Sequence, residues 1–407
     1  MAGILSGVRV LEWASYLNGP AAGGMLADLG AEVLKVEEPG KGDPMRGLKQ
    51  VFGVDVSLPD RSNTLFEVAN RGKKSITLDL RRPEGRDLAR ALARHCDIFL
   101  TNYRPPVLAQ MGVDYDALRA ENPRLVYVMA SMYGPRGPLA ERRGFDPIAQ
   151  ARSGVMWAVG LQEHEEPVFI TGGLLDMLGA TVTAWGAVLG LLHRERTGEG
   201  LLVDSSLLGS ALHIQAMVLA ALGLKGQAFR RHSRRRPEYP LTNYYRCADG
   251  GWMMLTELEP SRFFPQLAEA LGHPEWAQDP RFATARDRLA HADELRALLE
   301  QAFQERPLQE WLERFEAMDC PFPYSPVLSP QEVMEDAQAH ANRYIVEVEH
   351  PRLGRVRMPG FPLGFSTGPA EPAPSAPRVG EHTEEVLTGL LGLDRQALED
   401  LQNRGII

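Results

Sequence analysis

Cysteine is scarce in this sequence, and its three copies lie far apart. Cys96, Cys247 and Cys320 match no metal-binding or redox spacing. The ten histidines include no H-E-x-x-H pair or other paired ligand spacing, so we expect no metal site. Because the sequence offers no disulfide framework, it fits a reducing compartment, and we expect a cytoplasmic protein.

Signatures of several common enzyme classes are also missing. The sequence contains no G-x-S-x-G, which argues against a serine hydrolase. The turn at residues 17–24 has no G-x-G-x-x-G, and Pro20 lacks the N–H group that a pyrophosphate would use. We therefore do not expect an NAD site, although the acidic pair Glu37-Glu38 stands where a ribose-binding carboxylate would lie.

Charge and hydropathy exclude further classes. A net charge of −9 argues against general binding to nucleic acids or anionic membranes. The densest basic run, residues 230–236, has no interleaved aromatic residues, and we interpret it as a solvated linker or a site for acidic substrate groups. Residues 1–5 are neither basic nor strongly apolar, so no signal peptide is expected. A membrane-spanning helix needs about 20 largely apolar residues. The apolar stretches 177–192 and 207–224 do not meet this requirement, so we predict that they form buried core helices.

The first part of the sequence alternates strand and helix patterns, which predicts a parallel sheet with helices on both faces. Ligands of such sheets bind at the carboxyl ends of the strands. Candidate binding loops therefore lie at residues 16–20, 78–81, 102–104 and 131–134. The predicted strands are 7–13, 31–37, 75–80, 97–101 and 125–131, and the predicted helices are 20–29, 83–95 and 115–122.

The length of 407 residues favours two domains. The composition changes to Gly, Arg and Pro at residues 225–240, which indicates a boundary, and residues 241–325 read as a second unit of short strands and helices. The proline-punctuated stretch 346–377 predicts an extended passage, and two helices are predicted to follow it, at 381–390 and 394–404.

Asp176 has the most informative surroundings in the sequence. It follows the segment 171–175, which contains a glycine pair, and it opens a long apolar stretch. A helix N-terminus stabilises negative charge, so we expect the Asp176 carboxylate to stay ionised. Such a carboxylate can attack an activated acyl group. Asp is also a favoured N-cap residue, and the local pattern alone favours that simpler role.

Taken in order, eight segments resemble the family III CoA-transferases, the group that contains formyl-CoA transferase, carnitine CoA-transferase and α-methylacyl-CoA racemase. The similarity runs almost from end to end in collinear order, and it places Asp176 where the family has its catalytic aspartate. The segments are 7–12, 19–20, 25–37, 73–80, 102–105, 144–146, 191–200 and 380–383.

The resemblance implies an enzyme that moves CoA from an acyl-CoA donor to a carboxylic acid acceptor. Asp176 would attack the donor thioester and form an aspartyl–acyl anhydride, then an aspartyl-CoA thioester. Each step exchanges groups of similar acyl-transfer potential, so no metal or permanently bound cofactor is needed. N–H groups near Gly172-Gly173 or at Gly250-Gly251 are expected to stabilise the oxyanions.

The resemblance also implies an architecture and a set of CoA contacts. It suggests a Rossmann-like large α/β domain of residues 1–224 and 330–407, a small α+β domain of residues 225–329, and a homodimer of interlocked chains. Arginine suits the phosphates of CoA because of its bidentate fork. The positions carried over as CoA contacts are Asn18, Leu78, Asp79, Leu80, Arg81, Asn102, Tyr103, Arg104 and Arg143.

Three positions depart from patterns within the family. Leu17 and Glu38 replace a glutamine and an arginine of formyl-CoA transferases, which argues against formyl-CoA and oxalate as substrates. Phe145 replaces a histidine of the racemases, and a phenyl ring cannot move protons. An α-methylacyl-CoA racemase is therefore the weaker alternative. A non-catalytic CoA-binding partner subunit is another alternative, but such a subunit would not need Asp176.

Overall fold

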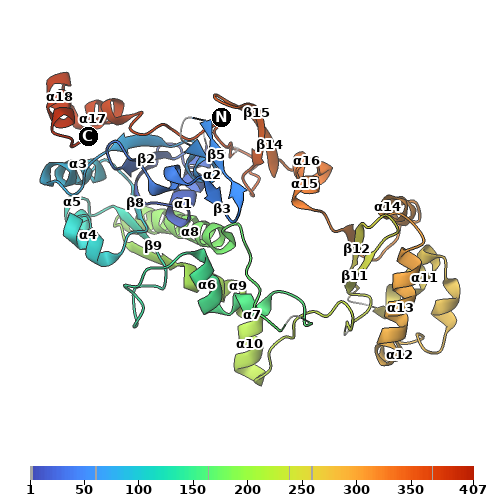
Figure 1. Ribbon diagram of the computed structural model, residues 1–407. Coiled ribbons are helices and arrows are strands. Elements are labelled where there is room, and N and C mark those ends of the chain that lie inside the picture. The colour runs from blue at the N-terminus through green and yellow to red at the C-terminus, as the bar shows by residue number, and fades with distance from the viewer. Residues whose placement is uncertain (1–2, 60–61, 164, 238, 258–259, 369) are drawn as a thin grey trace. The chain divides into compact units, whose positions relative to one another are not determined.

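The computed structural model describes residues 3–59, 62–163, 165–237, 239–257, 260–368 and 370–407 (Figure 1). The chain divides into two compact units. The first comprises Met1–Met156, Phe169–Ala228 and Ala337–Ile407, and the second comprises Trp157–Val168 and Phe229–Asp336. The second unit is thus inserted into the first, and it includes a short segment, 157–168, that the expected small domain did not contain.

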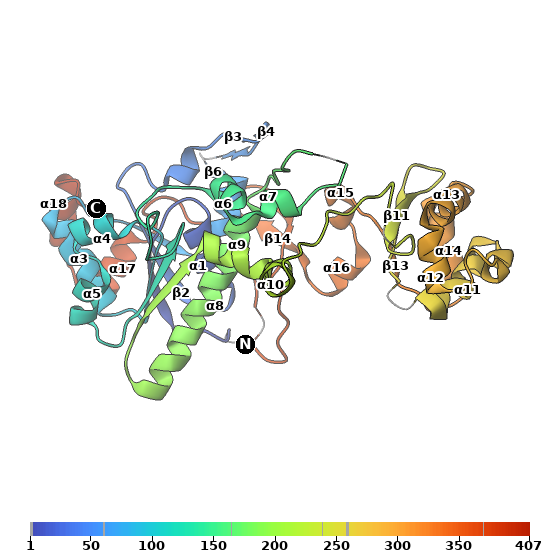
Figure 2. The same cartoon turned by 90° about the horizontal axis from the view of Figure 1, so that it is seen from below.

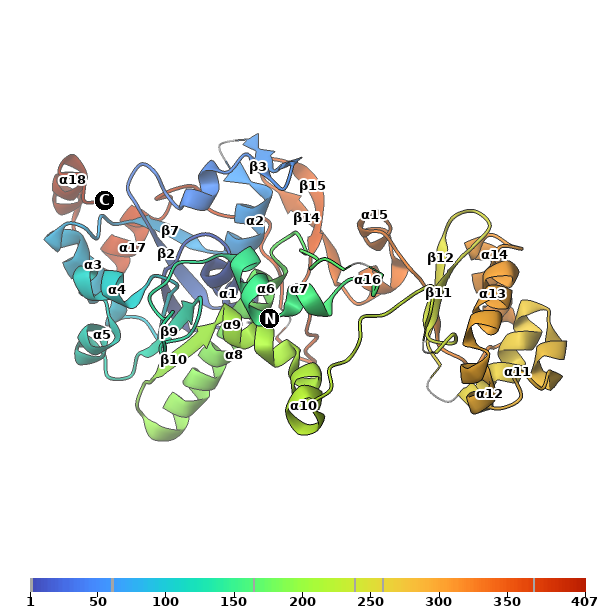
Figure 3. The same ribbon diagram turned by 60° about the horizontal axis from the view of Figure 1, so that its bottom comes forward.

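A six-stranded parallel sheet forms the centre of the first unit (Figures 1 and 3). The α/β prediction is confirmed in this sheet. Its spatial order is β10-β9-β8-β1-β2-β7, the doubly wound arrangement in which the direction of winding reverses beside the first strand, here between β1 and β8. The strands are β1 (Arg9–Trp13), β2 (Glu32–Glu37), β7 (Lys74–Thr77), β8 (Ile98–Thr101), β9 (Val126–Ser131) and β10 (Leu202–Ser206).

Helices cover both faces of the sheet because successive strand residues point to opposite sides. Val10 and Val33 belong to one hydrophobic core, and their neighbours Leu11 and Leu34 belong to the other. Figure 2 shows the helices of the second core gathered at one side of the sheet. The first core includes α1 (Asn18–Asp28), α2 (Thr64–Asn70) and α8 (Leu174–Thr197), and the second includes α3 (Pro83–Ala93), α4 (Pro105–Met111), α5 (Tyr115–Glu121), α17 (Thr383–Leu391) and α18 (Arg395–Asn403).

The helix that carries Asp176, α8, packs against α1, β9 and β10. By length and composition alone it could cross a membrane. Its buried side contains small residues such as Ala180, Ala184, Ala187 and Gly190, which allow a close approach to the sheet. This packing agrees with the prediction of a core helix at residues 177–192.

The apolar stretch 207–224 forms two helices, and the prediction of a buried core helix is wrong for the second of them, which has no buried residue. α9 (Leu207–Ile214) and α10 (Ala216–Lys225) meet at an angle of 70°. The break falls at Gln215, whose buried side-chain amide donates hydrogen bonds to the carbonyls of Ser153 (3.1 Å) and Ala211 (2.8 Å). These bonds hold the chain at the bend.

The stretch 346–377 begins in a β-hairpin, so its first part is extended as expected and is also paired, which the sequence did not indicate. The strands β14 (Ile345–His350) and β15 (Gly354–Pro359) pair in antiparallel register. Ile345, Val346 and Met358 are buried, while Arg357 forms an ion pair with Glu347 across the strands. Alternating burial and cross-strand charge stabilise this hairpin.

The second unit has its own core beneath an antiparallel sheet. Tyr245 stacks on Phe303 with 5.3 Å between ring centroids, and Trp311 and Phe315 surround them. The basic run 230–236 begins this unit's main segment. Its elements include β11 (Asn243–Arg246), β12 (Trp252–Leu255), β13 (Tyr324–Pro326), α11 (Pro260–Leu271), η3 (Pro274–Gln278), α12 (Ala285–Ala290), α13 (Ala292–Phe303), α14 (Leu308–Ala317) and α15 (Pro330–Val333).

The remaining elements are short. They are η1 (Pro44–Gly47), β3 (Gln50–Val51), β4 (Val54–Asp55), β5 (Ser57–Leu58), β6 (Ser62–Asn63), α6 (Asp146–Ser153), α7 (Val155–Ala158) and α16 (Ala337–Ala341).

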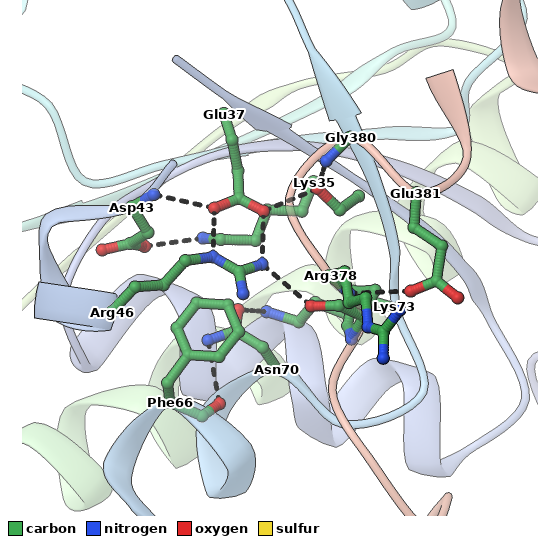
Figure 4. A network of polar contacts seen from close by, with 12 residues as sticks. Lys35, Glu37, Asp43, Arg46, Phe66, Asn70, Lys73, Arg378, Gly380 and Glu381 are labelled. Atoms are coloured by element: carbon green, nitrogen blue, oxygen red, sulfur yellow. Dashed lines mark hydrogen bonds and ion pairs between the residues drawn. The ribbon is translucent and has the colours of Figure 1, made fainter. Parts of the chain in front are cut away.

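Buried ion pairs join β1, β2 and the following loop. Figure 4 shows the part of this network that contains Lys35, Asp43 and the pair of Glu37 with Arg46. The Lys35 Nζ atom lies 3.0 Å from Glu12 Oε1 and 2.9 Å from Asp43 Oδ2. Lys73 shares the Glu12 carboxylate at 2.6 Å, and Arg46 pairs with Glu37 at 2.7 Å. Removing one member of a buried pair leaves an uncompensated charge, so this network fixes the positions of the backbone segments that carry it.

Candidate active site

Asp176 lies in the first turn of α8, where two glycines lead the chain into the helix. Gly172 and Gly173 have φ values of 92° and 70°, a left-handed conformation that glycine adopts most easily. A Cβ atom at position 173 would lie 2.9 Å from Leu17 Cδ2 and 3.9 Å from Asp176 Oδ2. The glycine pair therefore provides both the turn and the space beside the carboxylate.

The Asp176 side chain lines a pocket of about 480 Å³. Other parts of its wall come from residues 15–18 after β1, residues 102–104 after β8, and Ser131 at the end of β9. The winding of the sheet reverses between β1 and β8, and doubly wound sheets bind their ligands at this position. The pocket thus lies where the topology predicts a binding site.

The loop after β1 is tied to its neighbours by hydrogen bonds. The Ser15 N–H donates to Asn102 Oδ1 (3.0 Å), and Asn102 Nδ2 donates to the Ser15 carbonyl (2.7 Å). The Tyr16 N–H donates to Asp43 Oδ1 (3.2 Å), although Tyr16 has an unfavourable φ of 62°. Asn18 Nδ2 donates to the Asp176 carbonyl (3.3 Å). The side chains of Asn18 and Asn102 therefore organise the pocket.

Asp146, at the start of α6, binds the N-terminus of α8. Its Oδ2 atom accepts hydrogen bonds from the N–H groups of Leu175 (2.6 Å) and Asp176 (3.0 Å). These two N–H groups are thereby occupied and unavailable to an oxyanion. The other predicted donors, Gly250-Gly251, lie in the second unit. The donors of an oxyanion site stay a prediction.

The charge state of Asp176 differs from the expectation. Burial and, as a smaller cause, the negative charge of Asp146 together raise the pKa of Asp176 from its ordinary 3.8 to about 7. We expected the helix N-terminus to keep this carboxylate ionised, and that expectation is wrong because burial and the charge of Asp146 both favour the neutral form. Near neutral pH, Asp176 is divided between its protonated and ionised forms.

A second pocket, of about 250 Å³, adjoins the first, and Ser15, Tyr103 and Val107 line both. The structure distributes the sequence-predicted residues between the two. The first contains Asp176, Asn18, Asn102, Tyr103, Arg104 and Arg143, and the second contains Leu78, Asp79, Leu80, Arg81 and Tyr103.

The C-terminal part of the chain supports the wall of the second pocket. The Asp79 N–H donates to the Ile406 carbonyl at 2.8 Å. The Thr77 N–H donates to Thr383 Oγ1 at 3.0 Å. Segments more than 300 residues apart in sequence are thus joined at the edge strand of the sheet.

The comparisons with known proteins identify the family of this chain. Residues 5–383 match the model of a protein family described as CoA-transferase family III. The chain belongs to this family. The sequence prediction of the family and the enzyme class is confirmed: the chain is a CoA-transferase.

Individual CoA-transferases and a related structure align over nearly the whole chain. A succinyl-CoA–D-citramalate CoA-transferase of Chloroflexus aurantiacus is 35% identical, with 99% of this chain and 98% of the relative covered. A succinyl-CoA:glutarate CoA-transferase of Mus musculus is 33% identical, with 99% and 90% covered. The crystal structure of a CAIB/BAIF family protein from Brucella suis is 29% identical with a TM-score of 0.82, covering 96% of this chain and 100% of the other.

All three departures from patterns within CoA-transferase family III line the pockets. Leu17 and Phe145 belong to the first pocket, and Glu38 belongs to the second. Glu38 pairs with Arg81 at 3.1 Å, so the acidic residue engages a predicted phosphate-binding arginine. Arg81 also pairs with Asp79 at 2.8 Å. A phosphate at this position would compete with both carboxylates for the guanidinium group.

The sequence reasoning missed two residues that shape the site. The sequence indicated Asp146 only as the last residue of the 144–146 segment, and Tyr16 only as the first residue of the candidate loop 16–20. The signal for Asp146 was its place in the 144–146 segment, next to Phe145. Tyr16 gave no signal because its strained backbone and its edge-to-face contact with Phe145, at 5.3 Å between centroids, depend on tertiary structure. Across the residues that the structure describes, no group of three His, Cys, Asp or Glu could hold a metal.

Proposed function

We propose that this enzyme transfers CoA from an acyl-CoA donor to a carboxylic acid acceptor through covalent intermediates on Asp176. The observation that supports this most strongly is the position of Asp176 in the pocket at the reversal of the sheet, directly beside a second pocket. A reactive acyl group would lie in the first pocket and part of the CoA in the second. An ionisable carboxylate is then within reach of the thioester.

The chemistry proceeds by four acyl exchanges. A carboxylate oxygen of Asp176 attacks the thioester carbonyl, the C–S bond breaks, and CoA leaves as a thiolate, giving an aspartyl–acyl anhydride. The thiolate attacks the aspartyl carbonyl and releases the donor acid as a carboxylate, which leaves an aspartyl-CoA thioester. The acceptor carboxylate attacks this thioester and displaces the thiolate, and the thiolate then attacks the new acyl group and restores Asp176.

The two pockets support a division of CoA binding. Leu78, Asp79, Leu80 and Arg81 would bind the nucleotide end, as the family resemblance implies. Arg104 and Arg143 would bind phosphates nearer the reacting carbon, since the guanidinium group pairs well with phosphate. Tyr103, which stacks on Trp13 with 4.2 Å between centroids, lines both pockets.

We further propose that the substrates are dicarboxylic acids and that succinyl-CoA is the donor. The two relatives described above are named as succinyl-CoA enzymes. Three arginines, Arg104, Arg142 and Arg143, line the pocket that contains Asp176. Such a basic wall can pair with the distal carboxylate of a dicarboxylic acid as well as with CoA.

A racemase remains the second candidate because the pKa of Asp176, about 7, suits a general base. Racemisation also needs a proton donor on the opposite face of the α-carbon. At the position of the expected histidine stands Phe145, which is 57% exposed and lines the pocket. The transferase is therefore favoured.

Intact-mass measurement after incubation with succinyl-CoA tests the proposal. Without an acceptor acid, we expect the protein to gain the mass of CoA less one water, because the aspartyl-CoA thioester accumulates. Hydroxylamine is expected to remove the adduct, and peptide mapping is expected to place it on Asp176. Succinyl-pantetheine, which lacks the nucleotide, is the matched control and is expected to label more slowly.

The donor panel also includes formyl-CoA and an α-methylacyl-CoA. If none of these donors gives an adduct, the transferase mechanism is wrong. Exchange of the α-proton of the α-methylacyl-CoA in deuterated water would then establish the racemase. Equal labelling by succinyl-pantetheine and succinyl-CoA would contradict the proposed nucleotide site.

We also propose that two copies of the chain form a homodimer. The outer side of α8 and the following helices expose large apolar residues, including Trp185 (59% exposed), Leu189 (47%), Ile214 (63%) and Met217 (77%). An apolar surface of this kind is typical of a protein interface. Light scattering is expected to give twice the mass of one chain, and the mass of a single chain would contradict the proposal.

A further inference from the structure

The N-terminus of α8 is capped by a residue of another helix. Its own N-cap residue, Gly173, has no side chain to accept the free N–H groups. Asp146 of α6 replaces that function by accepting from Leu175 at 2.6 Å and from Asp176 at 3.0 Å. These are the second and third residues of α8, whose N–H groups an N-cap side chain normally binds.

Asp146 is itself held in place. Its Oδ1 atom accepts a hydrogen bond from Gln150 Nε2 at 2.5 Å, and the same Nε2 atom donates to the Ile170 carbonyl at 2.7 Å. The Ile170 N–H donates to Gln150 Oε1 at 3.1 Å. Asp146 is 4% exposed and Gln150 is fully buried. The two side chains therefore clamp both the start of α8 and the segment that leads to its glycine turn.

We propose that Asp146 is the positioning residue of this active site: by capping α8 from α6, it keeps the Asp176 carboxylate directed into the pocket and free to react. This inference rests on the proposed function, because it assigns the role of nucleophile to Asp176. It adds a residue that does not touch the substrate and acts through Asp176.

The geometry explains why a cap from another helix matters here. Asp176 is the third residue of α8, and an acidic side chain at that position can fold back to bind free N–H groups at the start of its own helix. Such bonds would stabilise the carboxylate and make it a weaker nucleophile. Asp146 occupies the neighbouring N–H groups, and its like charge repels the Asp176 carboxylate from the helix terminus.

The charge of Asp146 has a second effect on Asp176. After burial, it is the cause of the raised pKa of Asp176, and a more basic carboxylate is a stronger nucleophile. The other ionisable groups of the pocket wall are Tyr16, Tyr103, Arg104, Arg142 and Arg143. The elements packed against α8 carry Asp28, Tyr127, Arg152, Asp204 and His213, and α8 itself carries His193, Arg194, Glu195 and Arg196 near its C-terminal end.

The pH dependence of adduct formation separates positioning from simple structural support. The rate of aspartyl-CoA formation from succinyl-CoA is measured between pH 5 and 9 by rapid quenching and mass spectrometry. Asp146→Asn keeps the size of the side chain but removes the charge, and we expect its rate midpoint to move to lower pH and its plateau to fall about tenfold. For Asp146→Ala, which removes the cap, we expect a plateau about a hundredfold lower, because small misplacements of reacting groups reduce rates to this extent.

Two further variants control the experiment. Asp114→Asn changes the N-cap of α5, where Asp114 Oδ1 accepts from the Ala117 N–H at 3.1 Å, and both rate and midpoint are expected to match the wild type. Gln150→Met retains the Asp146 charge but loosens it, and a lower plateau with an unchanged or higher midpoint is expected. If circular dichroism shows that the Asp146 variants do not fold, Gln150→Met is used to test whether Asp146 positions Asp176.

The outcomes distinguish the two proposals. An absence of adduct on the wild type overturns the transferase mechanism and, with it, the role of Asp146. The positioning role alone is overturned if the wild type forms the adduct normally and Asp146→Asn has the same rate and midpoint as the wild type. If Asp146→Asn does not fold, the same result in Gln150→Met overturns it.

Discussion

Replacing Asp176 with asparagine is expected to lower CoA transfer at least about ten-thousand-fold, because the loss of a catalytic nucleophile has effects of this order or larger. An amide has nearly the same volume as the carboxylate but cannot form the anhydride. The pocket and the hydrogen bond from Asn18 to the backbone at position 176 are expected to remain. Transfer from succinyl-CoA to an acceptor dicarboxylate, followed by chromatography, measures the change.

Two controls are needed to attribute the loss of CoA transfer to the missing nucleophile. Deamidation of the asparagine in Asp176→Asn would restore aspartate in a small fraction of the protein and give background activity. Asp176→Ala cannot deamidate and is free of this background. Binding of CoA, measured by calorimetry, is expected to stay close to that of the wild type in both variants. If Asp176→Asn retained turnover within tenfold of the wild type, Asp176 would not be the nucleophile.

The same substitution is expected to stabilise the folded protein at alkaline pH by about 4 kcal/mol. Folding raises the pKa of Asp176 from about 4 to about 7, and each unit corresponds to about 1.4 kcal/mol. Above pH 7, the wild type must bury an ionised carboxylate beside the charge of Asp146. Asparagine is neutral at every pH and avoids this penalty.

The sign of the pH dependence follows from the raised pKa. Between about pH 4 and 7, folded Asp176 binds more protons than the unfolded residue does, so its contribution to stability falls as the pH rises through this window. It is fully present below pH 4 and lost above 7. Burial also raises the pKa of Asp204, to about 6, but that residue is present in both proteins and cancels in the comparison.

Urea unfolding at pH 5 and pH 8 provides the measurement. We expect the free energy difference between Asp176→Asn and the wild type to grow by about 3 kcal/mol from pH 5 to pH 8, since part of the effect is already lost at pH 5. The signal must report the first unit, since the chain folds into two; Trp13 stacked on Tyr103 lies in that unit. A difference independent of pH would show that the pKa of Asp176 is not raised by folding.

The sequence predicted the centre of the sheet better than its edge. The strands β1, β2, β8 and β9 were found within one or two residues because their apolar runs are buried on both faces. The edge strand β10, Leu202–Ser206, was missed because it is half polar and only its Ser205 is buried. The bend at Gln215 was missed because a hydrogen bond to the distant Ser153 produces it. A local sequence pattern does not show which distant residue will form a hydrogen bond.

For the active site, the family resemblance indicated which residues to consider, and the structure showed the contacts between them. Asp176 could be chosen from its glycine turn and the collinear motifs. Its raised pKa could not be predicted, since that depends on burial and on Asp146, which is 30 residues away in sequence. Likewise, Asn102 was assigned to CoA, while the structure shows that its amide binds the loop after β1.

The contact between Asp79 and Ile406 has a consequence for biosynthesis. Residues Thr77 to Asp79, the last two of which line the second pocket, leave the ribosome early. The groups that brace them, the Thr383 hydroxyl and the Ile406 carbonyl, belong to residues synthesised more than 300 positions later. The inserted second unit can fold during translation, since its own hydrophobic core is complete by residue 324. The nascent chain therefore holds an unfinished second pocket until Ile406 emerges, and the CoA binding proposed for this pocket is expected only after translation of the whole domain.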